Sequence, residues 1–239
     1  MNTRPLSPVL AFLIAAVWLA GVAVMAGAAL SWNDPNFTFL AALATLAVAS
    51  ELVDFAPFPN SRVSLSIALI LAAGTLSGLP GVAVVASAAA LADYAVHRKS
   101  VAKAAFNQGA LLLSGAAYVG ILEAFSSAYE AGDWPAVLGP ALLGSVVAFV
   151  VNSGLVALAI AVEKGLNIIS VWNARFRWLL PHYVLLGMLA LLTALAYDRW
   201  ELAGVALLLG PLGMAWLAIK QYVDHVAALI ALIPTTSRP

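Results

Sequence analysis

Eight apolar stretches, rarely interrupted by a charged residue, limit the folds open to this chain. They cover residues 8–30, 37–50, 63–77, 82–96, 104–122, 135–162, 178–197 and 202–219. A helix needs about 20 apolar residues, with a range of about 17 to 25, to cross the hydrocarbon core of a bilayer. Charged residues make up only 9% of the chain, whereas soluble domains carry about 25%. The sequence therefore predicts an all-α fold, a polytopic transmembrane helix bundle.

The number of spans depends on residues 63–96, whose two short apolar halves are separated by a Gly-Leu-Pro-Gly sequence at 78–81. Two brief spans would give about eight in total, and a re-entrant hairpin buried among its neighbours would leave six. We expect one bundle over residues 1–225 and a short tail over 226–239, first apolar and then polar. Residues 26–28 resemble a signal-peptide cleavage site, but the apolar run before them exceeds the ~7–15 residues of a signal-peptide core.

Lysine and arginine residues fall almost entirely on one side of this segment map. Positive residues in short loops favour the cytoplasmic side of a membrane. We therefore expect a multi-pass protein of the cytoplasmic (inner) membrane of a bacterium, with both termini in the cytoplasm, for either number of spans. Of the 11 basic residues, only Arg199 is then outside, and the inner ones are Arg4, Arg62, Arg98, Lys99, Lys103, Lys164, Arg175, Arg177, Lys220 and Arg238.

Two connections on the inner side carry clusters of positive charge. The first, over 97–103, is interpreted either as a topology anchor that contacts lipid phosphates or as a docking surface for a cytoplasmic partner. The second, over 166–178, has Ile169, Trp172 and Phe176 at helical spacing, which predicts a short helix lying in the inner interface. The docking candidates are His97, Arg98, Lys99 and Lys103 in the first connection, and Arg175 and Arg177 in the second.

Polar side chains at or within the apolar stretches are the candidates for ligand binding or for lining a polar cavity. Ionisable groups are costly in a membrane and often functional, and a deep amide seeks a partner on another helix. Interfacial anchoring, helix capping and interhelical contact are the alternative interpretations. Asp93 and His97 are one helical turn apart, so they can pair. The candidates are Glu51, Asp54, Asn107, Asn152 and His182.

Several classes of chemistry have no support in the sequence. The chain has no cysteine, which excludes disulfides and thiolate sites. It has no phosphate-binding glycine loop, no His-Glu-x-x-His and no nucleophile elbow. Its net charge is zero, so no strong field attracts nucleic acid. We therefore expect no enzyme, assign no catalytic residue and no metal site, and leave the cofactor unknown.

Small residues within the apolar stretches predict closely packed helices, in one bundle or in an oligomer. Such residues let helix backbones approach one another in a membrane. The positions are Ala20, Gly21, Ala28, Gly109, Gly115, Gly120, Gly144, Ser145 and Gly154.

A family resemblance rests on a series of short sequences in a fixed order. These are ELVDFAP at 51–57, RVSLSIA at 62–68, GLPG at 78–81, AFNQ at 105–108, VNS at 151–153 and WLLPHY at 178–183. The series, over roughly 37–223, resembles the multi-spanning N-terminal sensory modules of bacterial HD-GYP and GGDEF signalling proteins. In that family the module precedes a cytoplasmic cyclic-di-nucleotide domain. No such domain follows in this sequence, so the resemblance implies a module that works alone or through a partner.

Three functions follow from these patterns. The first is a non-enzymatic membrane module, sensory or a scaffold or accessory subunit of a membrane complex. The second is a small-molecule transport component, similar to the substrate-binding subunits of energy-coupling-factor transporters. The third is an intramembrane enzyme, for which Glu51, Asp54 and His182 are the best candidates. The expected partners are the lipid bilayer, a protein or second copy in the membrane, and a lipid-like or small-molecule ligand.

Overall fold

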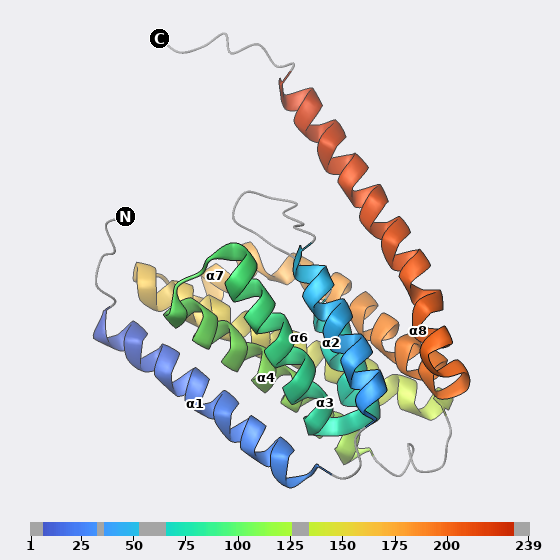
Figure 1. Ribbon diagram of the computed structural model, residues 1–239. Coiled ribbons are helices and arrows are strands. Elements are labelled where there is room, and N and C mark those ends of the chain that lie inside the picture. The colour runs from blue at the N-terminus through green and yellow to red at the C-terminus, as the bar shows by residue number, and fades with distance from the viewer. Residues whose placement is uncertain (1–6, 33–35, 53–65, 126–133, 232–239) are drawn as a thin grey trace.

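The computed structural model describes residues 7–32, 36–52, 66–125 and 134–231. Seven α-helices, one 3-10 turn and no strand lie in these ranges, which confirms the predicted all-α class (Figure 1). The helices are α1 (Pro8–Leu30), α2 (Phe37–Leu52), α3 (Ser66–His97), α4 (Val101–Ala124), α6 (Trp134–Lys164), α7 (Ile168–Arg175) and α8 (Leu180–Ala231), and the turn η1 covers Arg177–Leu179.

Five of the described helical segments are long and apolar enough to cross a membrane. They are α1, α3, α4, residues Pro135–Lys164 of α6 and the segment Arg177–Ala206. The predicted membrane helix bundle is therefore supported by length and composition. α2 is shorter, at 16 residues, which corresponds to about 24 Å of helix.

α3 is a tight hairpin of two helical limbs and not one continuous helix. Gly78 has φ 57° and ψ −145°, a conformation that only glycine adopts readily. A Cβ atom on Gly81 would overlap the carbonyl oxygen of Ala73, and one on Gly74 would lie 3.1 Å from the Val82 side chain. Residues eight apart in a straight helix are about 12 Å from each other, so the chain has reversed. The limbs 66–77 and 82–97 are about 18 and 24 Å long, both shorter than the ~30 Å hydrocarbon core.

α8 contains a second reversal with the same internal spacing. Glu201 has φ 51° and ψ −134°, and a Cβ on Gly204 would overlap the carbonyl oxygen of Ala196. The spacing is the same in both hairpins. The residue with positive φ lies five positions after the contacted alanine, and the glycine that touches this alanine lies eight positions after it. The sequences GLPGVA at 78–83 and ELAGVA at 201–206 match at four of six positions. The same corner geometry therefore occurs twice in the fold. Beyond the second corner, α8 extends away from the other helices (Figure 1).

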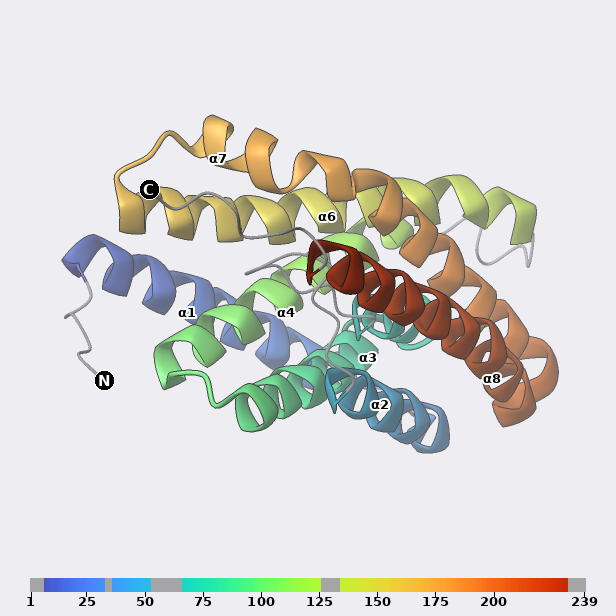
Figure 2. The same cartoon turned by 90° about the horizontal axis from the view of Figure 1, so that it is seen from above.

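The α3 hairpin lies at the centre of the bundle and α1 at its edge. In the most apolar part of α3, 72% of the residues are buried, against 17% in α1. Next to the α3 corner, the hydroxyls of Thr75 and Tyr118 are 2.8 Å apart, and Tyr118 is among the largest fully buried side chains. Figure 1 shows α1 at the edge of the bundle, and the view from above shows it crossing α4 (Figure 2). Most of α1 is therefore left uncovered by the other described helices.

Close helix approach occurs at most of the predicted small residues. A Cβ on Gly21 would lie 2.7 Å from the Gly109 Cα atom, and one on Gly144 would lie 2.8 Å from the Tyr118 ring. A Cβ on Gly115 would overlap Val82, and Ser145 lies against Gly187. Ala28 is also buried.

Three of these small residues make no close approach to another helix within the described chain, and their packing in an oligomer stays a prediction. No described atom lies within 4 Å of a Cβ built on Gly120 or Gly154, and Ala20 is exposed. These positions face away from the neighbouring helices. Which side of a helix faces its neighbours depends on how the helix is rotated about its axis in the bundle.

Candidate functional site: a buried polar cluster at one end of the bundle

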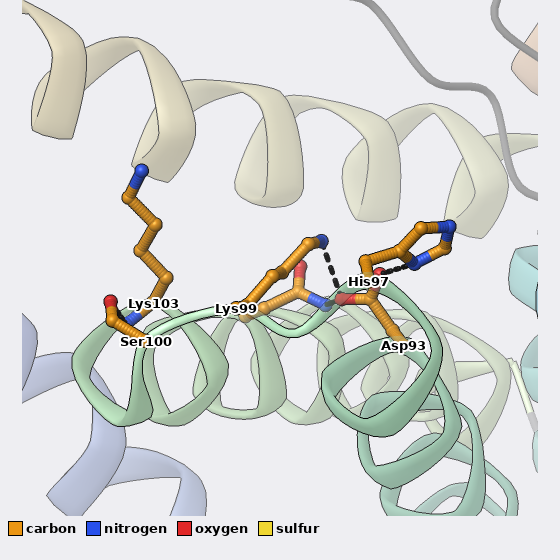
Figure 3. Close-up of polar contacts among 6 residues, drawn as sticks. Asp93, His97, Lys99, Ser100 and Lys103 are labelled. Carbon is orange, nitrogen blue, oxygen red and sulfur yellow. Dashed lines mark hydrogen bonds and ion pairs between the residues drawn. The ribbon is translucent and has the colours of Figure 1, made fainter. Parts of the chain in front are cut away.

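The last turn of α3 carries an acid and an imidazole in direct contact. Asp93 and His97 are four residues apart and so lie on one face of the helix. The His97 Nδ1 atom is 2.9 Å from Asp93 Oδ1, which confirms the predicted pair (Figure 3). Asp93 is buried, with 5% of its surface exposed. This burial makes the carboxylate dependent on the groups around it, because a buried charge needs partners.

The turn after α3 directs an ammonium group onto the same carboxylate. Arg98 has φ 47°, at a position after a helix where glycine is usual. The chain folds back there, and Lys99 Nζ lies 2.5 Å from Asp93 Oδ2. Ser100 then begins α4 by accepting a hydrogen bond from the backbone N–H of Lys103. The left-handed turn thus brings Lys99 inward, and Lys103 stays exposed.

α4 contributes an amide to the cluster. The Asn107 Nδ2 atom donates to Asp93 Oδ2 at 3.1 Å. One residue further on, Gln108 Nε2 donates to Ser87 Oγ of α3 at 3.4 Å. Asn107 was a candidate for interhelical contact or for a polar cavity, and its partner in the structure is a charged carboxylate. Asp93 therefore receives hydrogen bonds from an imidazole, an ammonium and an amide.

Glu51 completes the cluster from the end of α2. Its surface is 9% exposed. One carboxylate oxygen of Glu51, one of Asp93 and one ring nitrogen of His97 all lie within 4.8 Å of one another. The structure thus brings together Glu51 and Asn107, two of the predicted ligand-binding candidates, with His97 and Lys99, which were predicted as docking residues. No sequence motif links these residues.

Asn152 belongs to a separate polar contact between α6 and α8. Its Nδ2 atom donates to the Tyr183 hydroxyl at 3.0 Å. Next to it, Ser153 Oγ accepts from Trp172 Nε1 at 2.9 Å. The ring of Phe149 lies 4.7 Å from that of Tyr183 and 6.0 Å from that of Trp172. Asn152 therefore contacts another helix, as one of its two interpretations predicts, and helps to join α6, α7 and α8.

The other two predicted site residues are not placed in the cluster. His182 is half-buried, and its Nε2 atom has no hydrogen-bond partner in the described part of the chain. Asp54 lies outside the described residues.

The predicted short helix over 166–178 is present as α7. Asn167 caps it by accepting hydrogen bonds from the backbone N–H groups of Ile169 and Ser170. Trp172 and Phe176 pack on a small apolar cluster that contains Val171. Ile169 does not belong to this cluster and is 66% exposed. The cluster is formed with Ala157 and Ala161 of α6, and the position of α7 in the membrane interface stays a prediction.

The predicted docking residues divide into two groups. His97 and Lys99 turn toward the buried cluster. The exposed members are Arg98, Lys103, Arg175 and Arg177. Of the predicted docking residues, these four are therefore the exposed ones.

A comparison of the chain with protein-family models, curated proteins and solved structures finds no significant match. The resemblance to HD-GYP and GGDEF sensory modules therefore stays a prediction based on sequence patterns.

Proposed function

We propose that this chain is a non-enzymatic membrane module, sensory or accessory, that works by binding another protein within the bacterial cytoplasmic membrane. The observation that carries the proposal is the second limb of α8. After the reversal at Glu201 the helix continues for 30 residues to Ala231, which is about 45 Å. Figure 1 shows this arm leaving the rest of the bundle.

The arm's composition indicates what surrounds it. Residues 202–219 contain no charged residue, so this part of the arm is suited to a bilayer or to an apolar protein surface. Leu217, on the arm, is 50% exposed. Helices in membranes associate through close packing and interhelical hydrogen bonds. An apolar helix that extends beyond its own bundle is therefore available for packing against a partner.

The proposed orientation places the polar cluster on the cytoplasmic side. Glu51, Asp93 and Asn107 meet at one end of the bundle, next to the basic connection at 97–103. At the opposite end, Asn36 Nδ2 lies 2.5 Å from the Tyr197 hydroxyl. The lysine and arginine distribution supports the cytoplasmic assignment for the first of these ends. We propose the same orientation whether the α3 limbs are two short spans or a re-entrant hairpin.

Photo-crosslinking from the arm tests the proposal. A photoreactive amino acid is placed at Leu217, and the matched control carries it at Leu19 of α1, which is also exposed at 59%. After irradiation of intact cells, we expect one discrete cross-linked product from position 217, identified by mass spectrometry as a second membrane protein or a second copy. Position 19 should give lipid adducts and no such product. Lipid adducts alone from both positions would overturn the proposal.

A further inference from the structure

We propose that Glu51, Asp93 and His97 form a binding site for a divalent first-row transition metal ion, a property separate from partner binding. Two carboxylates and an imidazole supply the donors. Their ligand atoms lie within 4.8 Å of one another. Ligand atoms about 2.0–2.2 Å from a common zinc ion are roughly 3.3–3.6 Å apart. The ligand atoms are therefore at most about 1.5 Å further apart than a bound zinc ion requires.

Burial distinguishes this cluster from the acidic groups common on protein surfaces. Glu51 is 9% exposed and Asp93 5%. Buried carboxylates are held by the charged and polar groups around them, and metal ions are among the partners that proteins use for such groups. The donors stand at the end of α2 and in the last turn of α3, so two helices fix their backbones. Donors held on rigid elements lose little entropy when an ion binds.

A cation already occupies one donor in the structure. Lys99 Nζ lies 2.5 Å from Asp93 Oδ2, and the Lys99 side chain is 30% exposed. Figure 3 shows Lys99 and His97 approaching Asp93 from two sides. The lysine can swing toward water on its flexible stem, which would release this oxygen to an ion. Lys99 is therefore expected to compete with the metal.

Asn107 has the geometry of an outer partner to the site. It donates to Asp93 Oδ2 at 3.1 Å and so fixes the orientation of the carboxylate. Removal of such partners typically lowers metal affinity about 10- to 100-fold. Its role here is positioning, because an amide nitrogen does not ligate a cation.

The donor set selects the class of ion. Imidazole suits zinc, iron, nickel and copper, whereas magnesium and calcium prefer oxygen ligands alone. We therefore expect binding of Zn²⁺ and Co²⁺ and little competition from Mg²⁺. Water completes the coordination, since the cluster supplies three protein ligands.

The test measures Zn²⁺ binding to the purified full chain in mild detergent after chelator treatment, by competition with a chromogenic chelator. The visible spectrum of Co²⁺ reports ligation directly. We expect one ion per chain, at least a tenfold weaker affinity in His97→Gln, and a tighter affinity in Lys99→Met. His182→Gln and Lys103→Met are matched controls, because neither residue belongs to the cluster, and both should bind as the parent does.

Two results would overturn the proposal. One is the absence of stoichiometric Zn²⁺ binding both in the parent and in Lys99→Met, the variant without the competing ammonium. The other is parental affinity in His97→Gln, which would place the ion elsewhere. The Lys99→Met result still decides the matter if His97→Gln fails to fold.

Discussion

Replacing Gly109 with alanine should separate α1 from α4. At this crossing the two backbones touch: a Cβ on Gly109 would lie 2.5 Å from the Val17 carbonyl oxygen and 2.8 Å from its carbon. The glycine on the opposite helix, Gly21, is equally close to Gly109. Lipid offers α1 an apolar environment as good as the protein does, so tight packing is what holds it. An added methyl group acts on that packing directly.

The magnitude follows from the distances. Carbon atoms pack at about 3.5–4.0 Å, so the helices must move apart by roughly 1 Å, which forfeits about a quarter to a half of the dispersion attraction across the crossing. Overpacking of this kind costs about 1–3 kcal/mol. Against this, alanine favours a helix over glycine by about 1 kcal/mol. The same propensity gain applies to Gly120→Ala on the same helix, where no described atom lies within 4 Å of the new Cβ.

The difference between the two variants therefore isolates the packing term. We expect Gly109→Ala to be less stable than Gly120→Ala by about 1–3 kcal/mol. The free energy of unfolding is measured by titrating SDS into the protein in mild detergent and following helix content by circular dichroism. Equal stability of the two variants, within about 0.5 kcal/mol, would refute close backbone approach at this crossing.

Three further outcomes are expected. Glu201→Gly should stabilise the protein and Gly78→Ala destabilise it, each by about 1–3 kcal/mol in the SDS titration, because both residues have positive φ at the same corner; a destabilised Glu201→Gly would contradict this geometry. Tyr183→Phe should cost about 0.6–1.7 kcal/mol through loss of the Asn152 hydrogen bond, and no change would mean that the bond does not form. Trp172→Phe keeps an aromatic ring but loses the bond to Ser153, so hydrogen exchange in α7 should accelerate; unchanged exchange would count against its anchoring role.

The helices and their breaks were predictable because lipid imposes a length and a polarity on each segment. α1 has the predicted ends, and the α3 corner coincides with the predicted break at 78–81. Which face of a helix is buried was not predictable, since nearly every residue is apolar. Gly109 and Gly120 look alike in the sequence, yet only the first meets another helix. Amphipathic spacing, the usual guide to a buried face, is weak in such segments.

The site was predictable only in part. The pairing of Asp93 with His97 is local and follows from helical spacing. The approach of Glu51 and Asn107 depends on how α2, α3 and α4 pack, and no periodicity encodes it. Lys99 was predicted to belong to the basic connection that anchors the topology or docks a partner, and its inward turn follows the left-handed conformation of Arg98. A non-glycine residue in that conformation carries no sequence signal.

The two matching corners differ in the charge they carry, which bears on the proposed membrane orientation. The α8 corner places Asp198, Arg199 and Glu201 within four residues, all exposed, so in that orientation it belongs among the lipid headgroups. The α3 corner has no charged residue between 78 and 81, and none of these four residues is exposed. Because it has no charged side chain to be solvated, the α3 corner can lie below the headgroups. The charged α8 corner would thus fix the height of the bundle relative to the headgroups. The depth of the α3 corner would follow from the helices packed around it.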